Sequence, residues 1–381
     1  MSEVISESNI ENPDAPLVSV IVPAYNVDGY VSNAIGSLLD QTLRDIELIV
    51  IDDGSTDATG SILQSMAYRD PRLHVLTVDN GGAAKARNIG LSHATGKYVY
   101  FADADDWAYP TALETMASLA ELNDAELVVA GFEIDTYMRP NLVPSLIKAN
   151  VGEDDFGIYA VERKTTAPCV YRERKAFRRA ACPMFDNNLL YTPWNKLFLR
   201  SRIEENGFRF REGDFWDDFP FCLDYIRDVE RVVTTPDIVY RFRRIRSDSE
   251  TTRWRDCYEK REEEHSWMID LYRHWELLTD KDVNEMLHRR YIERVVGCIE
   301  SVCDPASGMD APARRRRIGK MMDTGRVGNA LMSAQPRSPL MRVMLMPMRL
   351  GSVKLMEAEG RIISLAKRRT PELFATLKAM R

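Results

Sequence analysis

Short apolar runs alternate with amphipathic stretches through the first third of the chain. The runs have the length of buried strands, and they lie at residues 18–22, 46–51, 73–77, 98–101 and 127–130. Between them, helices are expected at 30–39, where apolar side chains recur at helical spacing, and at 84–92 and 111–122. Strands and helices that alternate in this way favour a parallel sheet with helices on both faces. The pattern therefore predicts an α/β fold.

Two kinds of residue mark the expected ends of these elements. Pro23 is expected to end the first strand, because proline has no N–H to give to a sheet. Ser55 or Thr56 is expected to cap the helix that carries Ile62 and Leu63.

Polar residues gather where four of the predicted strands end. These segments are 23–26, 52–55, 80–82 and 103–106. Ligands of parallel sheets bind beyond the carboxyl ends of the strands, so the four segments are expected to face one crevice. Carboxylates, glycine backbone and a nearby Arg87 suit a nucleotide and a metal ion. The chain has no GxGxxG after the first strand and no GxxxxGK[ST] motif, which disfavours dinucleotide-binding and P-loop proteins.

The fourth predicted strand runs directly into Asp103, Asp105 and Asp106. Clustered carboxylates repel one another, and burial would raise their pKa values, so solvent or a metal ion must relieve them. Their oxygens suit a hard divalent cation whose remaining ligands are water and substrate phosphates. The alternative is a solvated acidic turn that begins the helix after Pro110.

The other polar segments have plain alternatives as well. Asp52 and Asp53 could form a turn, and 80–82 is a turn signal by itself. Arg87 could be a surface residue of a helix, and Tyr25 could simply pack.

Four segments resemble, in order and separation, the motifs of the family 2 glycosyltransferases with the GT-A fold. They are VIVPAYN at 20–26, VIDDGSTD at 50–57, NGGAAKARNIG at 80–90 and FADADDW at 101–107. Lys85 and Ala104 depart from the usual Ala and Ser. The resemblance is firm over 16–135 and weaker to about 250. It implies a Rossmann-like, mostly parallel sheet, a nucleotide-sugar donor, a Mn²⁺ or Mg²⁺ ion, and transfer with inversion at the anomeric carbon.

The resemblance also implies roles for individual residues. Those expected to contact the nucleotide-sugar are Pro23, Tyr25, Asn26, Asp52, Asp53, Gly82, Arg87, Asp103 and Lys196. Asp103 and Asp105 would bind the metal ion. Lys196 would contact the diphosphate or else lie on a rim.

Inverting transfer needs a base that takes the proton from the acceptor hydroxyl. The pair Asp217–Asp218 lies among aromatic residues and resembles the family's later acidic pair, with Asp in place of the usual Glu. We expect Asp218 to be the base, with Asp217 as the second choice. Trp194 and Trp216 are expected to contact the acceptor. The alternative for the acidic pair is that it begins the helix 219–226.

The second half of the chain is expected to complete the enzyme. Residues 1–15 are predicted to be a disordered arm, 16–135 the nucleotide-sugar half, 136–250 the acceptor half and 251–381 a helical extension. Six scattered cysteines without a CxxC pair, no leader peptide and no long apolar run predict a cytoplasmic protein.

The net charge of −7 hides a basic tail, since residues 311–381 hold 16 Lys+Arg against 4 Asp+Glu. Basic segments rich in Met and Leu, such as 340–350, can lie on an anionic membrane surface. The alternative is a solvated basic helix pair that closes the fold. The acidic remainder of the chain argues against nucleic-acid binding.

Taken together, the sequence predicts an inverting, metal-dependent glycosyltransferase with a glycan or lipid-linked acceptor, acting in cell-surface polysaccharide synthesis at the inner membrane face. A nucleotidyltransferase is disfavoured because the chain lacks a glycine-rich basic loop after the first strand. A non-catalytic scaffold that binds nucleotide-sugars is disfavoured by the intact Asp103, Asp105 and Asp218.

Overall fold

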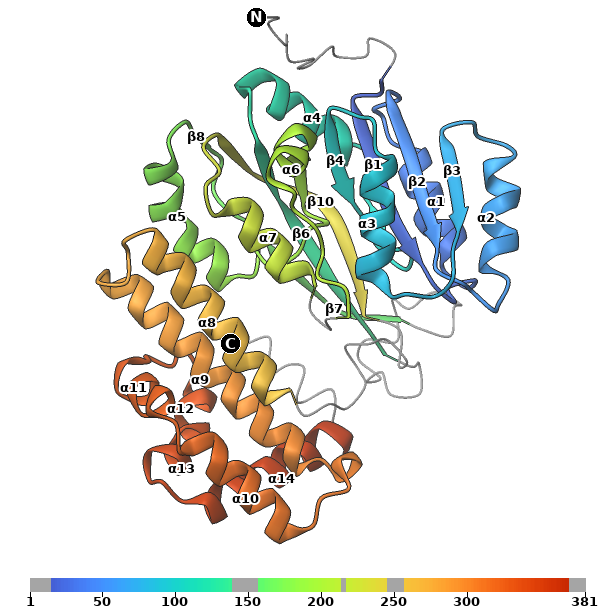
Figure 1. The fold of residues 1–381 in the computed structure, drawn as a ribbon. Helices are drawn as coiled ribbons and strands as arrows, with labels where there is room; N and C mark the ends of the chain where they lie inside the picture. Colours follow the sequence, from blue (N-terminus) through green and yellow to red (C-terminus); the bar gives the residue numbers. More distant parts are fainter. Residues whose placement is uncertain (1–14, 139–156, 214–216, 245–256, 370–381) are drawn as a thin grey trace, which may run out of the picture. The chain divides into compact units, whose positions relative to one another are not determined.

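The computed structural model describes residues 15–138, 157–213, 217–244 and 257–369. The chain divides into two compact units, Met1–Ile245 and Arg246–Arg381 (Figure 1).

A ten-stranded sheet forms the centre of the first unit, in the order β3-β2-β1-β4-β9-β6-β10-β5, with β7 beside β6 and β8 beside β10. The strands are β1 (Val18–Ala24), β2 (Ile46–Asp52), β3 (Leu73–Thr77), β4 (Tyr98–Phe101), β5 (Trp107–Ala108), β6 (Leu127–Met138), β7 (Gly157–Lys164), β8 (Cys169–Tyr171), β9 (Lys196–Leu199) and β10 (Val232–Arg244). β1 to β4 are parallel, and β9 pairs antiparallel with both β4 and β6. The predicted α/β class is confirmed, with parallel pairing among the first four strands and again between β6 and β10.

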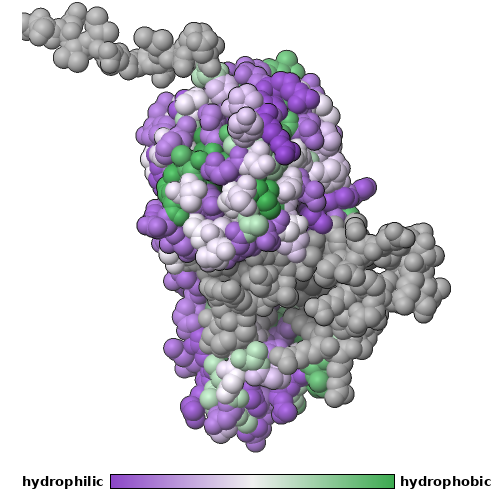
Figure 2. Space-filling view, turned by 90° about the vertical axis from the view of Figure 1, so that its right-hand side faces the viewer, coloured by the Kyte–Doolittle hydropathy of each residue, from purple (hydrophilic) through white to green (hydrophobic). Residues whose placement is uncertain are grey.

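Helices cover the sheet, and α3 and α7 lie in front of it in Figure 1. The helices of this unit are α1 (Val31–Leu39), α2 (Thr59–Ala67), α3 (Ala83–His93), α4 (Ala112–Asn123), α5 (Arg174–Asp186), α6 (Arg200–Asn206) and α7 (Asp218–Ile226). The face at the β3 edge is largely hydrophilic, with small separate hydrophobic areas (Figure 2). All four residues of β4 are buried, as predicted for a central strand.

Two predicted element ends are wrong. β1 continues through Pro23 to Ala24, and Ala24 accepts a hydrogen bond from the Asp53 N–H on the β2 side. Successive residues of a strand face opposite neighbours, so Pro23 faces the β4 side, where β4 has ended at Phe101. The missing N–H of Pro23 therefore breaks no bond to a neighbouring strand.

The second wrong end is the cap of α2, which begins at Thr59 after Ala58. Asp57 Oδ1, rather than Ser55 or Thr56, accepts from the Thr59 N–H at 2.9 Å. The Ser55 hydroxyl instead accepts from the Asn26 N–H, which ties the β2 loop to the β1 loop.

The second unit is helical. Its helices are α8 (Tyr258–His274), α9 (Lys281–Cys303), α10 (Ala311–Met322), α11 (Gly325–Ser333), α12 (Pro339–Met344), α13 (Met346–Arg349) and α14 (Val353–Arg369), with a 3₁₀ turn at Pro305–Ser307. Its core combines side chains of α9 and α10 with Met341, Met344, Leu345 and Met348. Arg314 and Arg315 bind the buried carboxylate of Glu357, so part of the basic tail closes this unit. Within the described ranges, no helix has both the length and the apolar character needed to span a membrane.

Candidate active site

Arg87 joins three carboxylates from two distant parts of the first unit. Its Nη2 lies 2.8 Å from Asp103 Oδ1, and its Nη1 lies 3.0 Å from both Asp217 Oδ2 and Asp218 Oδ1. The guanidinium lies over the ring of Phe210, 5.3 Å from its centre. Asp103 follows β4 and Asp218 begins α7, so one buried cation connects the end of a central strand to the start of a distant helix.

Burial and charge shift the pKa values of this cluster. Burial raises the pKa of Asp218 to about 7; Arg87 opposes the shift, and the neighbouring Asp217 and Asp103 add to it. The pKa of Asp217 is raised by burial as well. Burial disfavours the charged form of Arg87, but the three carboxylates outweigh it and raise its pKa above the ordinary value. A single positive charge thus faces three acidic groups, one of which titrates near neutral pH.

The turn after β4 is fixed by β10. The Asp103 N–H donates to the Tyr240 hydroxyl at 2.9 Å, and Asp106 Oδ1 accepts from the Arg243 N–H at 2.8 Å. Asp106 is only 3% exposed, and burial, with the charges of Asp105 and Asp103, raises its pKa well above the usual range. Of the three predicted carboxylates, Asp106 therefore faces the protein, while Asp103 and Asp105 stay half-buried.

Asp103 and Asp105 suit a divalent cation, because hard cations take carboxylate oxygens. No group of three or more His, Cys, Asp or Glu side chains that could hold a metal ion occurs among the residues that the structure describes. An ion at this turn would need water or a bound phosphate for its other ligands.

Asp53 anchors the loop before α3. Its Oδ1 and Oδ2 accept from the N–H groups of Gly81 and Gly82, both at 2.8 Å. Gly82 has φ +88°, a conformation that side chains disfavour, so glycine sets the chain direction into the helix that carries Arg87. Asp52 Oδ1 accepts from the Ser55 N–H at 3.1 Å. Asp52 and Asp53 therefore do stabilise turns, as the alternative interpretation expected. Their predicted contacts with the nucleotide stay predictions.

Two residues after β1 lie at the same end of the sheet. Asn26 has φ +49°, and its Oδ1 accepts from the Thr56 N–H at 2.8 Å. Tyr25 is 45% exposed, so its ring is open to solvent rather than packed. The neighbouring Pro23 is half-buried. The exposed ring of Tyr25 is therefore free to meet a ligand.

Two other predicted residues lie inside the protein. Lys196 is fully buried, and its Nζ donates to the carbonyls of Leu189 and Thr192, both at 2.5 Å. Burial lowers the pKa of Lys196 to about 8. Trp194 is 5% exposed and stacks on Tyr240, with 4.6 Å between the ring centres. Both side chains are therefore enclosed by the protein, and their predicted ligand contacts stay predictions.

Two residues that contact the charge cluster were not identified from the sequence. Tyr240 had no signal, because it lies 137 residues from Asp103. Phe210, beneath Arg87, was visible only as one of several aromatic residues near Asp217. Trp216 lies outside the described residues.

Comparisons with known proteins agree on one family. The family model described as Glycosyl transferase family 2 matches residues 19–205. The uncharacterized glycosyltransferase EpsJ of Bacillus subtilis is 29% identical over 307 residues, which are 80% of this chain and 83% of that protein. Hyaluronan synthase of Pasteurella multocida is 32% identical over 158 residues, which are 38% of this chain and only 16% of that protein.

Solved structures agree on the fold. The crystal structure of S. aureus TarS residues 1–349 in complex with UDP-GlcNAc has a TM-score of 0.57 and 17% identity, and the match covers 92% of this chain and 91% of that one. The match confirms the predicted fold class over both units.

We expect Arg87→Gln to lower the free energy of unfolding by about 3 kcal/mol at pH 8, because it leaves three poorly solvated carboxylates without their cation. At pH 5 the loss should be smaller, since Asp218, with a pKa of about 7, is then neutral and needs no cation. Urea denaturation at both pH values measures the difference.

The matched control is Arg72→Gln, which breaks the ion pair with Asp70 nearer the surface and should cost under about 1 kcal/mol. An Arg87→Gln loss that is equal at the two pH values would contradict the charge-balance argument.

Proposed function

The chain belongs to the family 2 glycosyltransferases, and on this premise we propose that it moves a sugar from a nucleotide-sugar to a hydroxyl of a glycan or lipid-linked acceptor, with inversion at the anomeric carbon. One observation carries the proposal: Arg87 holds Asp103, on the predicted donor side, against the acidic pair Asp217–Asp218. The similarity to a hyaluronan synthase supports a role in polysaccharide synthesis.

The donor is proposed to lie beyond the carboxyl ends of β1, β2 and β4, as ligands of such sheets do. The exposed ring of Tyr25 offers a face for the base, and Asp52 lies at the end of β2 beside it. The UDP-GlcNAc bound to TarS supports a nucleotide-sugar as the class of donor. The base and the sugar are left open.

Asp103 and Asp105 are proposed to hold Mn²⁺ or Mg²⁺. When bound, a divalent cation would stabilise the negative charge on the departing nucleoside diphosphate. Arg87 already bonds one oxygen of Asp103, so it orients that carboxylate and fixes its distance from the acidic pair.

Asp218 is proposed to take the proton from the acceptor hydroxyl. A base works best when its pKa lies near the working pH, and that of Asp218 is raised to about 7. Its side chain is 28% exposed against 12% for Asp217, so Asp218 is the more accessible of the two. Asp218 is also the first residue of α7, where the helix dipole favours its charged form.

We expect the rate of nucleoside diphosphate release to rise about tenfold per pH unit below pH 7 and to level off above it. The base must be unprotonated to act, and the pKa of Asp218 is about 7. Asp218→Asn should abolish this limb of the profile together with most of the activity.

Asp217→Asn serves as the matched comparison. It removes a negative charge that raises the pKa of Asp218, so the midpoint should move to lower pH while activity remains. A flat profile in the wild type would remove Asp218 from the role of base.

The donor and metal assignments are tested by thermal stability with a panel of nucleotide-sugars, each with and without Mn²⁺ or Mg²⁺. A ligand at about 100 times its Kd adds about 2.7 kcal/mol to apparent stability. We expect one nucleotide-sugar to raise the Tm of the wild type only when the metal ion is present. In Asp105→Asn, the same nucleotide-sugar and metal ion should not raise the Tm. Asp79→Asn, which removes an exposed carboxylate just after β3, should keep it.

Two outcomes would count against the proposal. No shift with any nucleotide-sugar would reject the donor site. A shift without turnover on any acceptor would favour a scaffold that binds nucleotide-sugars.

Membrane contact is proposed for the second unit, through α14 rather than through Arg314 and its neighbours. Exposed Leu355, Ile362 and Leu365 recur at helical spacing on α14, beside the exposed Lys354 and Arg361. An apolar stripe flanked by basic residues suits an anionic membrane surface.

In vesicle flotation, we expect the full chain to bind phosphatidylglycerol vesicles and not phosphatidylcholine vesicles. Leu355→Ser combined with Ile362→Ser should reduce binding at least fivefold. Leu122→Ser, which removes a more exposed leucine on α4, should leave it unchanged. Weak binding that is equal for all three proteins would reject the membrane contact.

A further inference from the structure

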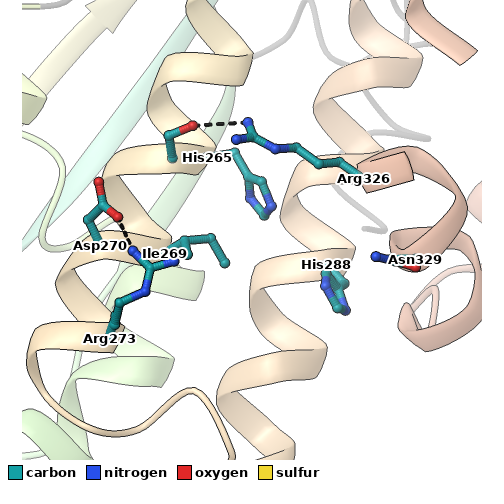
Figure 3. A pocket seen from close by; sticks show the side chains of 8 residues that line it. His265, Ile269, Asp270, Arg273, His288, Arg326 and Asn329 are labelled. Atoms are coloured by element: carbon teal, nitrogen blue, oxygen red, sulfur yellow. Dashed lines mark hydrogen bonds and ion pairs between the residues drawn. The ribbon is translucent and has the colours of Figure 1, made fainter. Parts of the chain in front are cut away.

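A hollow of about 290 Å³ lies in the second unit, and its lining contains none of the residues discussed for transfer. Its walls are one face of α8 from His265 to Arg273, His288 of α9, and Arg326 and Asn329 of α11 (Figure 3). That volume corresponds to roughly ten water molecules, so it can hold more than a bare ion.

Hydrogen-bond donors dominate the lining. Arg326 Nη1 donates to Glu262 Oε2 at 3.0 Å and to Ser266 Oγ at 2.9 Å. Its other N–H groups have no hydrogen bond among residues that the structure describes, and half of the side chain is exposed. The carboxylate in the lining is Asp270, and it is paired with Arg273. The guanidinium of Arg326 is therefore held in place and is still accessible to a ligand.

Burial favours the neutral form of both histidines of the hollow. Burial lowers the pKa of His265 to about 4, with Arg326 and His288 adding to the shift and Glu262 and Glu264 opposing it. Burial also lowers the pKa of His288, against the charge of Glu285.

The two imidazoles differ in their contacts within the described part of the chain. The His265 ring is held by stacking, whereas one ring nitrogen of His288 has no hydrogen-bond partner. The His265 ring stacks on Tyr291, with 4.3 Å between ring centres. His288 Nδ1 is buried and has no hydrogen-bond partner within the described part of the chain. A buried polar atom without a partner costs about 1–3 kcal/mol, which a ligand would recover.

We propose that this hollow binds the phosphate group of a phosphate ester. A guanidinium with free N–H groups is a strong phosphate ligand, and the amide of Asn329 and the two imidazoles add donors around it. The second unit carries 26 Lys+Arg against 20 Asp+Glu, so it attracts anions, unlike the acidic first unit. The volume beyond one phosphate leaves room for a glycerol or sugar on the ester.

The bound phosphate has a consequence for the histidines. A negative charge favours the protonated imidazole, so binding raises the pKa of His265 and His288. By linkage, the phosphate ester binds more tightly as the pH falls toward the raised pKa.

The test is an NMR titration of the full-length protein with glycerol 3-phosphate and with inorganic phosphate. The chain has only five histidines, so their ring resonances can be assigned by single His→Gln variants. We expect saturable shifts of His265 and His288, and a rise in the pKa of His265 of about one unit, equivalent to tenfold tighter binding to the protonated form.

Arg326→Gln should weaken binding at least tenfold, and Asn329→Leu at least threefold, with the Tm of each variant showing that it is folded. The matched control is Arg317→Gln, whose guanidinium pairs with Glu259 and does not line the hollow; it should bind as the wild type does. The proposal would be overturned if the histidine resonances did not shift with either of the two ligands at about 50 mM. It would also be overturned if Arg326→Gln bound them with the same affinity as the wild type.

Vesicles distinguish the two sources of a phosphate ester. If the group belongs to a lipid, Arg326→Gln should reduce flotation with phosphatidylglycerol vesicles at least threefold. If it belongs to a soluble ester, glycerol 3-phosphate should bind at least tenfold more tightly than inorganic phosphate, and flotation should not change. This site does not depend on the proposed transfer, so either proposal can fail alone.

Discussion

The structure of the first unit depends on the compensation of three carboxylates by the single guanidinium of Arg87. Removing charged groups from water is expensive unless opposite charges meet them closely. Asp53 fixes the loop that begins α3, and the turn after β4 is held by β10. Phe210, stacked at 4.1 Å on Phe221 of α7, supports the guanidinium from below. The surrounding fold can be understood as the framework that holds this charge cluster together.

The sequence predicts those parts of the site that depend on local pattern. An apolar run that ends in Asp103 and Asp105 marks both the strand and its functional end, since the side chains that signal each are neighbours. Contacts across the sheet carry no such signal. The partner of Asp106 is a backbone N–H in β10, and Lys196 is enclosed by carbonyls that only the folded chain brings to it. Whether a polar side chain faces solvent or protein is decided by such distant partners.

The basic tail illustrates the same limit in the second unit. Its composition predicted two alternatives, a membrane surface or a closed helix pair, and the structure assigns different residues to different tasks. Arg314 and Arg315 bind Glu357, and Arg317 binds Glu259, so these arginines are used inside the unit. The apolar stripe of α14 remains exposed. Composition cannot separate these residues, because helical phase and packing decide which way each one faces.

The separation in sequence between Arg87 and its partners also governs when the cluster can form during synthesis. Asp103 lies 16 residues from Arg87, whereas Asp217 lies 130 residues away. A chain emerging from the ribosome therefore presents the residues of the first ion pair long before those of α7, because synthesis begins at the N-terminus. Until residue 218 has left the exit tunnel, the strands β1 to β4 must hold together with Arg87 only partly neutralised. Any fragment that ends before α7 remains in that incomplete state.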